Sequence, residues 1–287
     1  MFNSSVLEVA IGLTFCYATL ALIVSTLQEA LASALQMRAR TLLGGIKTML
    51  NDPRFNGMAR ALYSHALINP HDDGQLSSQS GLRHKPSYIE PLHFAIALID
   101  LVQRVPGKID QLGSDIDTLR DPQLRRALQG IYLRANGDLK LFQDGVAAWF
   151  DSAMDRVSGE YKRRSLLVSV LLSLLLTIMF NIDSIHLFKT LWQHPALAAQ
   201  ITAAPTAVNR ESIDLLFTLP IGWEKFPPLW DGSFLLQVAG WIITTSTSLF
   251  GAPFWFSTLQ RVMQLRGTGA KPEEALPLVR ARIMRRV

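Results

Sequence analysis

Cysteine and charge are the two things this sequence has little of. Only one of its 287 residues is a cysteine, Cys16, so no disulfide framework holds the fold together. Charged residues make up 18% of the chain, against about 25% in an ordinary soluble domain. Hydrophobic residues reach 49% and the mean hydropathy is +0.20, so the composition indicates a membrane protein with a soluble part.

Catalytic and cofactor motifs are also absent from the sequence. It contains no P-loop and no GxGxxG, GxSxG, HExxH or CxxC string. No recognised ligand spacing relates His71, Asp72, Asp73, His84 and His93, which we interpret as polar residues of a loop rather than a metal site. Long blocks of like charge are lacking, so we expect no nucleic-acid partner. We predict no catalytic residue, no metal and no cofactor, and a protein that is not an enzyme.

Three apolar runs are long enough for transmembrane helices, at residues 6–27, 165–182 and 234–256. The second run has about 18 residues, or about 27 Å of helix, which matches the hydrocarbon core of a bilayer. The first run carries one charged residue, Glu8, and the other two carry none. Residues 1–5 contain no Lys or Arg, so we interpret the first run as a retained helix rather than a signal peptide.

Residues 139–182 are predicted to form one long helix that passes from water into lipid. Apolar residues three and four apart give its first half one buried face: Leu139, Phe142, Val146, Trp149, Ala153 and Val157. No proline interrupts the run before Asp183. We therefore expect a rigid helical strut that joins a soluble helical domain to the second span.

The fold class that follows is an all-α membrane protein, because no segment alternates with the period of two that strands require. We predict three transmembrane helices and a cytoplasmic helical domain that is continuous with the second span. The segments are 1–36 (first span and its extension), 37–164 (cytoplasmic all-helical domain), 165–182 (second span), 183–233 (extracytoplasmic interfacial segment), 234–256 (third span) and 257–287 (basic cytoplasmic tail).

Within the cytoplasmic domain, turn and capping residues predict where helices start and stop. Helices are expected over 55–68 and 91–102, and a further helix should begin at Pro122 after Asp121. Asp138 is the expected N-cap of the long helix, and the polar stretch 70–86 is expected to be an exposed loop. The helix of the first run is expected to continue through Leu42, until Gly44 and Gly45 loosen it.

Basic residues mark which ends of the runs face the cytoplasm. Arg38, Arg40 and Lys47 follow the first run, whereas none precedes it. The string Lys162-Arg163-Arg164 directly precedes the second run, and Arg261 and Arg266 follow the third. By the positive-inside rule the N-terminus lies outside and the C-terminus inside, in a multi-pass protein of a bacterial inner membrane.

Small and aromatic residues suggest how the runs pack and where they meet the interface. Small side chains at helical spacing in the first run are expected to pack against a similar face of Thr244, Ser248 and Gly251: Ala10, Thr14, Ala18, Ala21 and Ser25. Residues 185–192 resemble an interfacial helix. Trp223, Phe226 and Trp230 fit an aromatic belt.

The most specific string in the chain is 154–164, MDRVSGEYKRR. One interpretation is a charged helix surface that ends in a basic membrane anchor; the other is a docking surface for anionic lipid or an acidic partner. The candidate interaction and anchor residues are Asp155, Arg156, Tyr161, Lys162, Arg163 and Arg164. A catalytic role is not expected, because Ser158 has no base near it in sequence.

A second unusual string is 251–256, GAPFWF. Gly251, Pro253 and Trp255 are the candidate hinge or packing residues, at a kinked helix end anchored at the interface or at a constriction. Glu8, Glu29 and Asp183 are the acids nearest the bilayer, and their positions at the edges of runs favour interfacial solvation over an ion path.

Three strings taken together resemble a family of uncharacterised bacterial inner-membrane proteins. They are Lys85-Pro86-Ser87-Tyr88-Ile89 with Phe94-Ala95-Ile96-Ala97-Leu98-Ile99-Asp100, the 154–164 string, and 251–256 followed by Leu265-Arg266-Gly267. The resemblance covers most of the chain. It implies an inner-membrane protein with a cytosolic helical domain, and it implies no activity.

Two functions remain open from the sequence, and a deep cytoplasmic pocket with converging His and Asp side chains would add an enzyme as a third. The first is a membrane anchor or adaptor that presents the 37–164 domain to a cytoplasmic protein partner. The alternative is an oligomeric channel or membrane-disrupting effector, suggested by the Pro253 kink and the hydroxyls of Thr244, Thr245, Thr247 and Ser248. The expected partners are thus the lipid bilayer, a cytoplasmic protein and, for the alternative, further copies of the chain.

Overall fold

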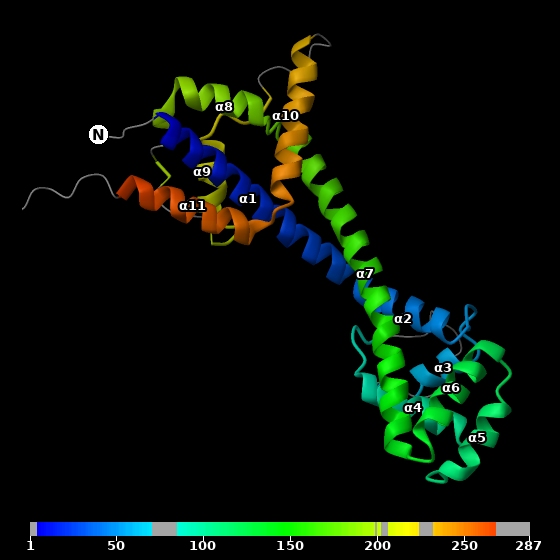
Figure 1. Ribbon diagram of the computed structural model, residues 1–287. Helices are drawn as coiled ribbons and strands as arrows, with labels where there is room; N and C mark the ends of the chain where they lie inside the picture. The colour runs from blue at the N-terminus through cyan, green and yellow to red at the C-terminus, as the bar shows by residue number, and fades with distance from the viewer. Residues whose placement is uncertain (1–4, 71–84, 199, 202–205, 224–231, 268–287) are drawn as a thin grey trace, which may run out of the picture. The chain divides into compact units, whose positions relative to one another are not determined.

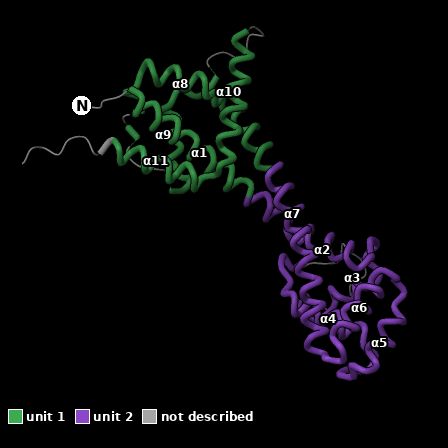
Figure 2. The backbone as a smooth tube through the Cα atoms, in the orientation of Figure 1, with its two compact units in different colours: residues 1–28, 168–287 green, residues 29–167 purple. Residues whose placement is uncertain are grey.

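The fold is all-helical, as the sequence predicts. A computed structural model describes residues 5–70, 85–198, 200–201, 206–223 and 232–267, and none of these forms a strand (Figure 1). Two compact units make up the chain: one contains residues 1–28 and 168–287, and the other contains residues 29–167 (Figure 2). We call them the split unit and the continuous unit.

Helices make up the regular structure of the described residues. The first six are α1 (Ser5–Ala34), α2 (Met37–Met49), α3 (Met58–Tyr63), α4 (Pro91–Val102), α5 (Ile109–Asp117) and α6 (Pro122–Ala135). They are followed by α7 (Leu139–Met179), α8 (Ser184–Gln193), the 3-10 turn η2 (Pro195–Ala198), α9 (Arg210–Phe217), α10 (Gly232–Ser248) and α11 (Ala252–Gly267). The predicted long helix from residue 139 is confirmed as α7, which ends three residues earlier than expected.

One hydrophobic core holds the continuous unit together. Its fully buried side chains come from α2, α3, α4, α5, α6 and the first half of α7, and include Leu43, Ile46, Leu62, Tyr63, Phe94, Leu98, Leu112, Ile116, Leu124, Leu128, Phe142, Val146 and Phe150. The rings of Phe94 and Phe150 stack with centroids 4.1 Å apart, which fixes α4 against α7. Burial raises the pKa of the Tyr63 phenol, so it stays protonated at neutral pH.

Two helix starts in this unit are set by local chemistry, as predicted. A carboxylate oxygen of Asp121 accepts a hydrogen bond from the backbone N–H of Leu124 at 2.6 Å and caps α6, whose first residue is Pro122. Asp138 accepts from the backbone N–H of Lys140 at 2.7 Å at the start of α7. The predicted helix 91–102 is confirmed as α4.

Two other predictions for this unit are wrong. The expected helix 55–68 is only α3, because Phe55 has a left-handed φ of 55° and the Asp52 carboxylate holds the N–H groups of Asn56 and Gly57 in a turn. The helix after the first run breaks at Gln36, whose φ is 50°, and α2 then passes through Gly44 and Gly45. Helix α5 was not predicted.

Gly45 lies in α2 at a position where a side chain of α7 packs against the backbone of α2. A Cβ at Gly45 would overlap Cγ2 of Val157 on α7, and would lie 3.1 Å from Cγ1. No neighbouring atom lies within 4 Å of a Cβ at Gly44. Gly45 therefore permits close helix packing, and it does not end the helix as expected.

In the split unit, α1 is the best candidate for a membrane-crossing helix. Among the described helices it is the one that is by itself long and apolar enough to cross a membrane, and 61% of its most apolar window is buried by protein. Thr14, Ala18 and Ala21 of the predicted small-residue stripe are buried, whereas Ser25 is exposed. A Cβ at Gly12 would lie 2.6 Å from Cδ1 of Leu191, so α1 packs closely on α8.

The other two runs form bent helix pairs rather than straight spans. Helices α7 and α8 are long and apolar enough to cross a membrane only when they are taken together, with a 50° bend between them. The third run is not one helix, because α10 ends at Ser248 and α11 follows at 97°. The chain therefore holds one candidate span among its described residues, or up to three if each bent pair is one span.

Several predictions lie outside the described residues. They concern Phe226 and Trp230 of the aromatic belt, residues 71–84 of the polar loop, and the basic tail after residue 267. Trp223 is described, and its indole N–H donates to the carbonyl of Ile178 at 3.1 Å.

Candidate docking groove

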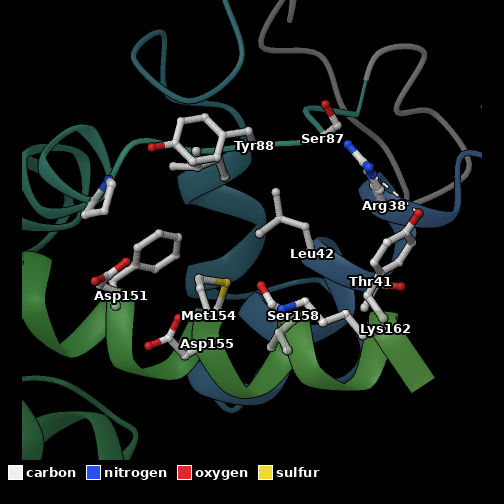
Figure 3. Close-up of a pocket in the computed structure, with 15 residues that line it drawn as sticks. Arg38, Thr41, Leu42, Ser87, Tyr88, Asp151, Met154, Asp155, Ser158 and Lys162 are labelled. Atoms are coloured by element: carbon white, nitrogen blue, oxygen red, sulfur yellow. Dashed lines mark hydrogen bonds between the residues drawn. The ribbon is translucent and has the colours of Figure 1, made fainter. Parts of the chain in front are cut away.

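A groove of about 510 Å³ lies in the continuous unit, between α2, α7 and the segment 87–91 (Figure 3). Its apolar lining is made by Leu42, Ile89, Phe150, Met154 and Val157. Polar and charged side chains surround these residues: Arg38, Thr41, Ser87, Tyr88, Asp151, Asp155, Ser158, Tyr161 and Lys162. The groove thus combines an apolar surface with groups of both charges.

Helix periodicity explains why α7 supplies so many of these groups. Asp151, Asp155, Ser158 and Lys162 follow one another at spacings of four, three and four, which places them on one face of the helix. The opposite wall is an extended segment before Pro91, because a residue that precedes proline is restricted to extended conformations.

Charge is divided between the two ends of the groove. Asp151 and Asp155 occupy one end, whereas Arg38 and Lys162 lie at the other (Figure 3). The Arg38 Nε donates a hydrogen bond to the Tyr161 hydroxyl at 3.3 Å, and the guanidinium carbon lies 5.6 Å from the centre of that ring. The hydrogen bond raises the pKa of Arg38 above its ordinary value, so this end is permanently cationic.

The structure brings half of the predicted interaction residues into the groove. Asp155, Tyr161 and Lys162 line it, whereas Arg156 and Arg163 do not. Arg164 instead forms an ion pair with Glu160 at 2.6 Å, one turn away on the same helix.

Sequence reasoning missed the residues of the other walls, of which Arg38 matters most, and did not name Phe150. Arg38 was assigned to membrane topology alone, whereas Phe150 lies four residues after Val146 on the apolar face that the sequence assigned to the long helix. Ser87, Tyr88 and Ile89 stand in one of the strings that carried the family resemblance, which was the one available signal for this wall.

The predicted hinge residues form the corner between α10 and α11. Gly251 has a φ of +83°, a left-handed conformation that side chains other than glycine rarely adopt. Pro253 lies in the first turn of α11, where its missing N–H is not needed. The Trp255 indole N–H donates to the carbonyl of Thr247 at 2.6 Å, and its ring packs against Tyr17 with centroids 4.9 Å apart.

The hydroxyls that suggested a pore are mostly buried inside the split unit. Thr244 donates to the carbonyl of Ile182 at 2.7 Å and is 2.7 Å from the hydroxyl of Ser184, which also accepts from Tyr17 at 2.9 Å. The hydroxyls of Ser248 and Ser173 are 2.5 Å apart. Thr245 is also buried and Thr247 is half-buried, so these side chains pack helices together within one chain.

No group of three or more metal-ligating side chains occurs among the residues that the structure describes. His93 lies 3.4 Å from Glu90, and Asp183 accepts from the backbone N–H of Ile185 at 2.8 Å as the N-cap of α8. No family model, curated protein or solved structure matches the chain.

Proposed function

We propose that the chain is a membrane anchor and adaptor. In this proposal the split unit is embedded in a bacterial inner membrane, and the continuous unit lies in the cytoplasm. The groove between α2, α7 and the segment 87–91 then binds a protein partner. The N-terminus would lie outside and the C-terminus inside, as the positive-inside rule predicts from the distribution of basic residues.

Exposed apolar side chains support the membrane part of the proposal. On α7, Leu167, Leu171, Leu175 and Ile178 are each exposed, at spacings of three and four that form one stripe. Helix α10 exposes Leu235, Leu236, Ile242 and Ile243. Soluble proteins rarely expose large apolar patches, whereas a lipid-facing surface requires them. The three spans would be α1, the second half of α7 with α8, and α10 with α11, because the last two are long enough only as bent pairs.

The groove is the single observation that carries the adaptor function. It presents Met154 and Val157 beside buried Phe150, and a partner side chain that enters it would cover apolar surface already shaped as a pocket. Acids at one end and bases at the other would orient the bound segment. The channel alternative has less support, because most of the hydroxyls that suggested it bond within the unit.

Site-specific photocrosslinking in native membranes tests this function. A residue with a benzophenone side chain replaces Met154 or Tyr88 in the groove. In the control variants it replaces Leu133 or Leu141, which are exposed in the same unit. The exposed fractions of Tyr88 and Leu133 are similar, at 71% and 76%. We expect a discrete protein adduct from both groove positions and not from the controls. Adducts of the same mass and yield at all four positions would contradict a docking groove, as would none at all. An adduct of twice the chain mass would identify the partner as a second copy.

A further inference from the structure

Two cations at one end of the groove form no ion pair with a carboxylate of the described residues. Arg38 donates a hydrogen bond to the Tyr161 hydroxyl and is attracted electrostatically by Glu29 without forming an ion pair with it, and Lys162 forms no ion pair with any residue that the structure describes. Arg164, two residues further along α7, is by contrast paired with Glu160. Arg38 and Lys162 therefore form a basic site with charge left to neutralise.

The side chains around these cations suit a phosphate group. Ser87 and Ser158 are exposed, line the same groove and form no hydrogen bond with other described side chains. An arginine held by a neighbouring ring offers a planar pair of N–H donors, and a lysine adds a flexible point charge. Figure 3 shows Arg38, Ser87 and Lys162 at the end of the groove away from Asp151.

The position of Lys162 on its helix identifies the source of the phosphate. Leu166 and Leu167 are 55% and 62% exposed and begin the apolar stripe of α7. Lys162 precedes Leu166 by four residues, or about 6 Å of helix. Lipid headgroups occupy roughly 5–7 Å on each side of the hydrocarbon core. If the apolar stripe of α7 enters the bilayer, Lys162 lies at the depth of the phosphates.

We propose that Arg38 and Lys162, with the hydroxyls of Ser87 and Ser158, bind the headgroup phosphate of an anionic phospholipid in the cytoplasmic leaflet. The inference rests on the membrane placement in the proposed function. It leaves the acid-lined end of the groove to the protein partner, so that lipid and partner occupy opposite ends of one site.

The acidic residues of the groove are too far from Arg38 and Lys162 to cancel the positive potential there. Asp155 and Asp151 precede Lys162 by seven and eleven residues, or about 10 and 16 Å of helix. Screening at physiological ionic strength acts over about 8 Å, so the basic end keeps its own potential. An anionic lipid is favoured over a zwitterionic one because the two cations face a single phosphate without a competing ammonium group.

Native mass spectrometry of the full chain in detergent micelles tests the site, with phosphatidylglycerol as the added lipid and phosphatidylcholine as the comparison. We expect Arg38→Gln and Lys162→Gln each to weaken phosphatidylglycerol binding about fivefold, the effect of one basic residue at an anionic surface. Arg163→Gln removes the same charge at the same depth but outside the groove, and Arg126→Gln removes one from α6. Both controls should change binding less than twofold.

Three results would overturn the site. An equal loss with Arg163→Gln would mean general surface attraction, and equal binding of phosphatidylcholine would remove the charge preference. Competition by millimolar glycerol phosphate would identify a soluble ligand instead of a lipid. Lys162→Arg keeps the charge and should bind normally. If Arg38→Gln lowers the unfolding midpoint, Lys162→Gln alone decides the outcome.

Carbonate extraction of membranes separates this inference from the proposed function. A chain that stays in the pellet but shows no preference for phosphatidylglycerol refutes the lipid site and leaves the anchor intact. A chain released into the supernatant refutes the membrane placement, and the lipid site with it.

Discussion

Gly45 on α2 and Val157 on α7 lie so close that a methyl group at Gly45 would overlap the valine side chain. Valine cannot move aside easily, because its branched side chain has few allowed rotamers in a helix. We therefore expect Gly45→Ala to destabilise the chain by about 1–3 kcal/mol through overpacking. The measurement is the thermal unfolding midpoint of the purified full chain.

The neighbouring glycine provides the control for this prediction. Gly44 is exposed, and a Cβ there would meet no atom within 4 Å. Gly44→Ala should stabilise the helix by up to about 1 kcal/mol. The double variant with Gly45→Ala and Val157→Ala should recover part of the loss. If both single alanine variants stabilise the chain equally, α2 and α7 do not pack as described.

Asp121 should stabilise α6 by about 1 kcal/mol as its N-cap, so Asp121→Ala should lower the unfolding midpoint. Asp144→Ala, an exposed change in the second turn of α7, should not lower it. A result in which the two alanine variants have the same midpoint would contradict the cap.

The pH dependence of this cap has a definite sign. The pKa of Asp121 is lowered by the backbone N–H of Leu124 and by the side-chain amide of Asn51, which lies 2.5 Å from it. A carboxylate with a depressed folded pKa stabilises the protein above its unfolded pKa of about 4, and loses this effect as the pH falls through the folded pKa. The stability advantage of the wild type over Asp121→Asn should therefore shrink below about pH 4. An advantage that grows below about pH 4 would contradict the stabilising role of the Asp121 carboxylate.

The corner between α10 and α11 depends on the left-handed conformation of Gly251. Gly251→Ala should cost about 1–2 kcal/mol, because a Cβ clashes with the backbone in this conformation. Gly232→Ala at the start of α10 has open space and no left-handed φ, and should be close to neutral. Equal unfolding midpoints for the two variants would argue against the corner.

The parts of the fold that were predicted are those fixed by neighbours in sequence. Pro91 and Asp121 mark helix starts through their own backbone and the next three residues, so the sequence is enough to locate α4 and α6. The break after Ser248 was not predicted, because an uncharged run has the same hydropathy whether or not it bends. Gly45 was misinterpreted because its role depends on Val157, more than a hundred residues away.

The candidate site was predicted only on one wall for the same reason. The 154–164 string named Tyr161 and Lys162 because all of its residues lie on one helix. Arg38 and Tyr88 reach the groove from distant parts of the chain, and no local periodicity relates them to α7. Their meeting depends on the buried core of the continuous unit, which places α2 and the segment 87–91 beside that helix.

Spin-label accessibility in proteoliposomes tests the central claim most directly. Single cysteines replace Leu171, Leu175 or Leu133 in a Cys16→Ala background; these leucines are 57%, 59% and 76% exposed. All three labels are free of protein cover, so their relaxation reports the solvent. We predict that the labels at positions 171 and 175 are relaxed by oxygen and not by an aqueous nickel chelate. The label at position 133 should be relaxed by the nickel chelate and not by oxygen. Nickel relaxation at 171 and 175 as strong as at 133 would contradict the membrane anchor.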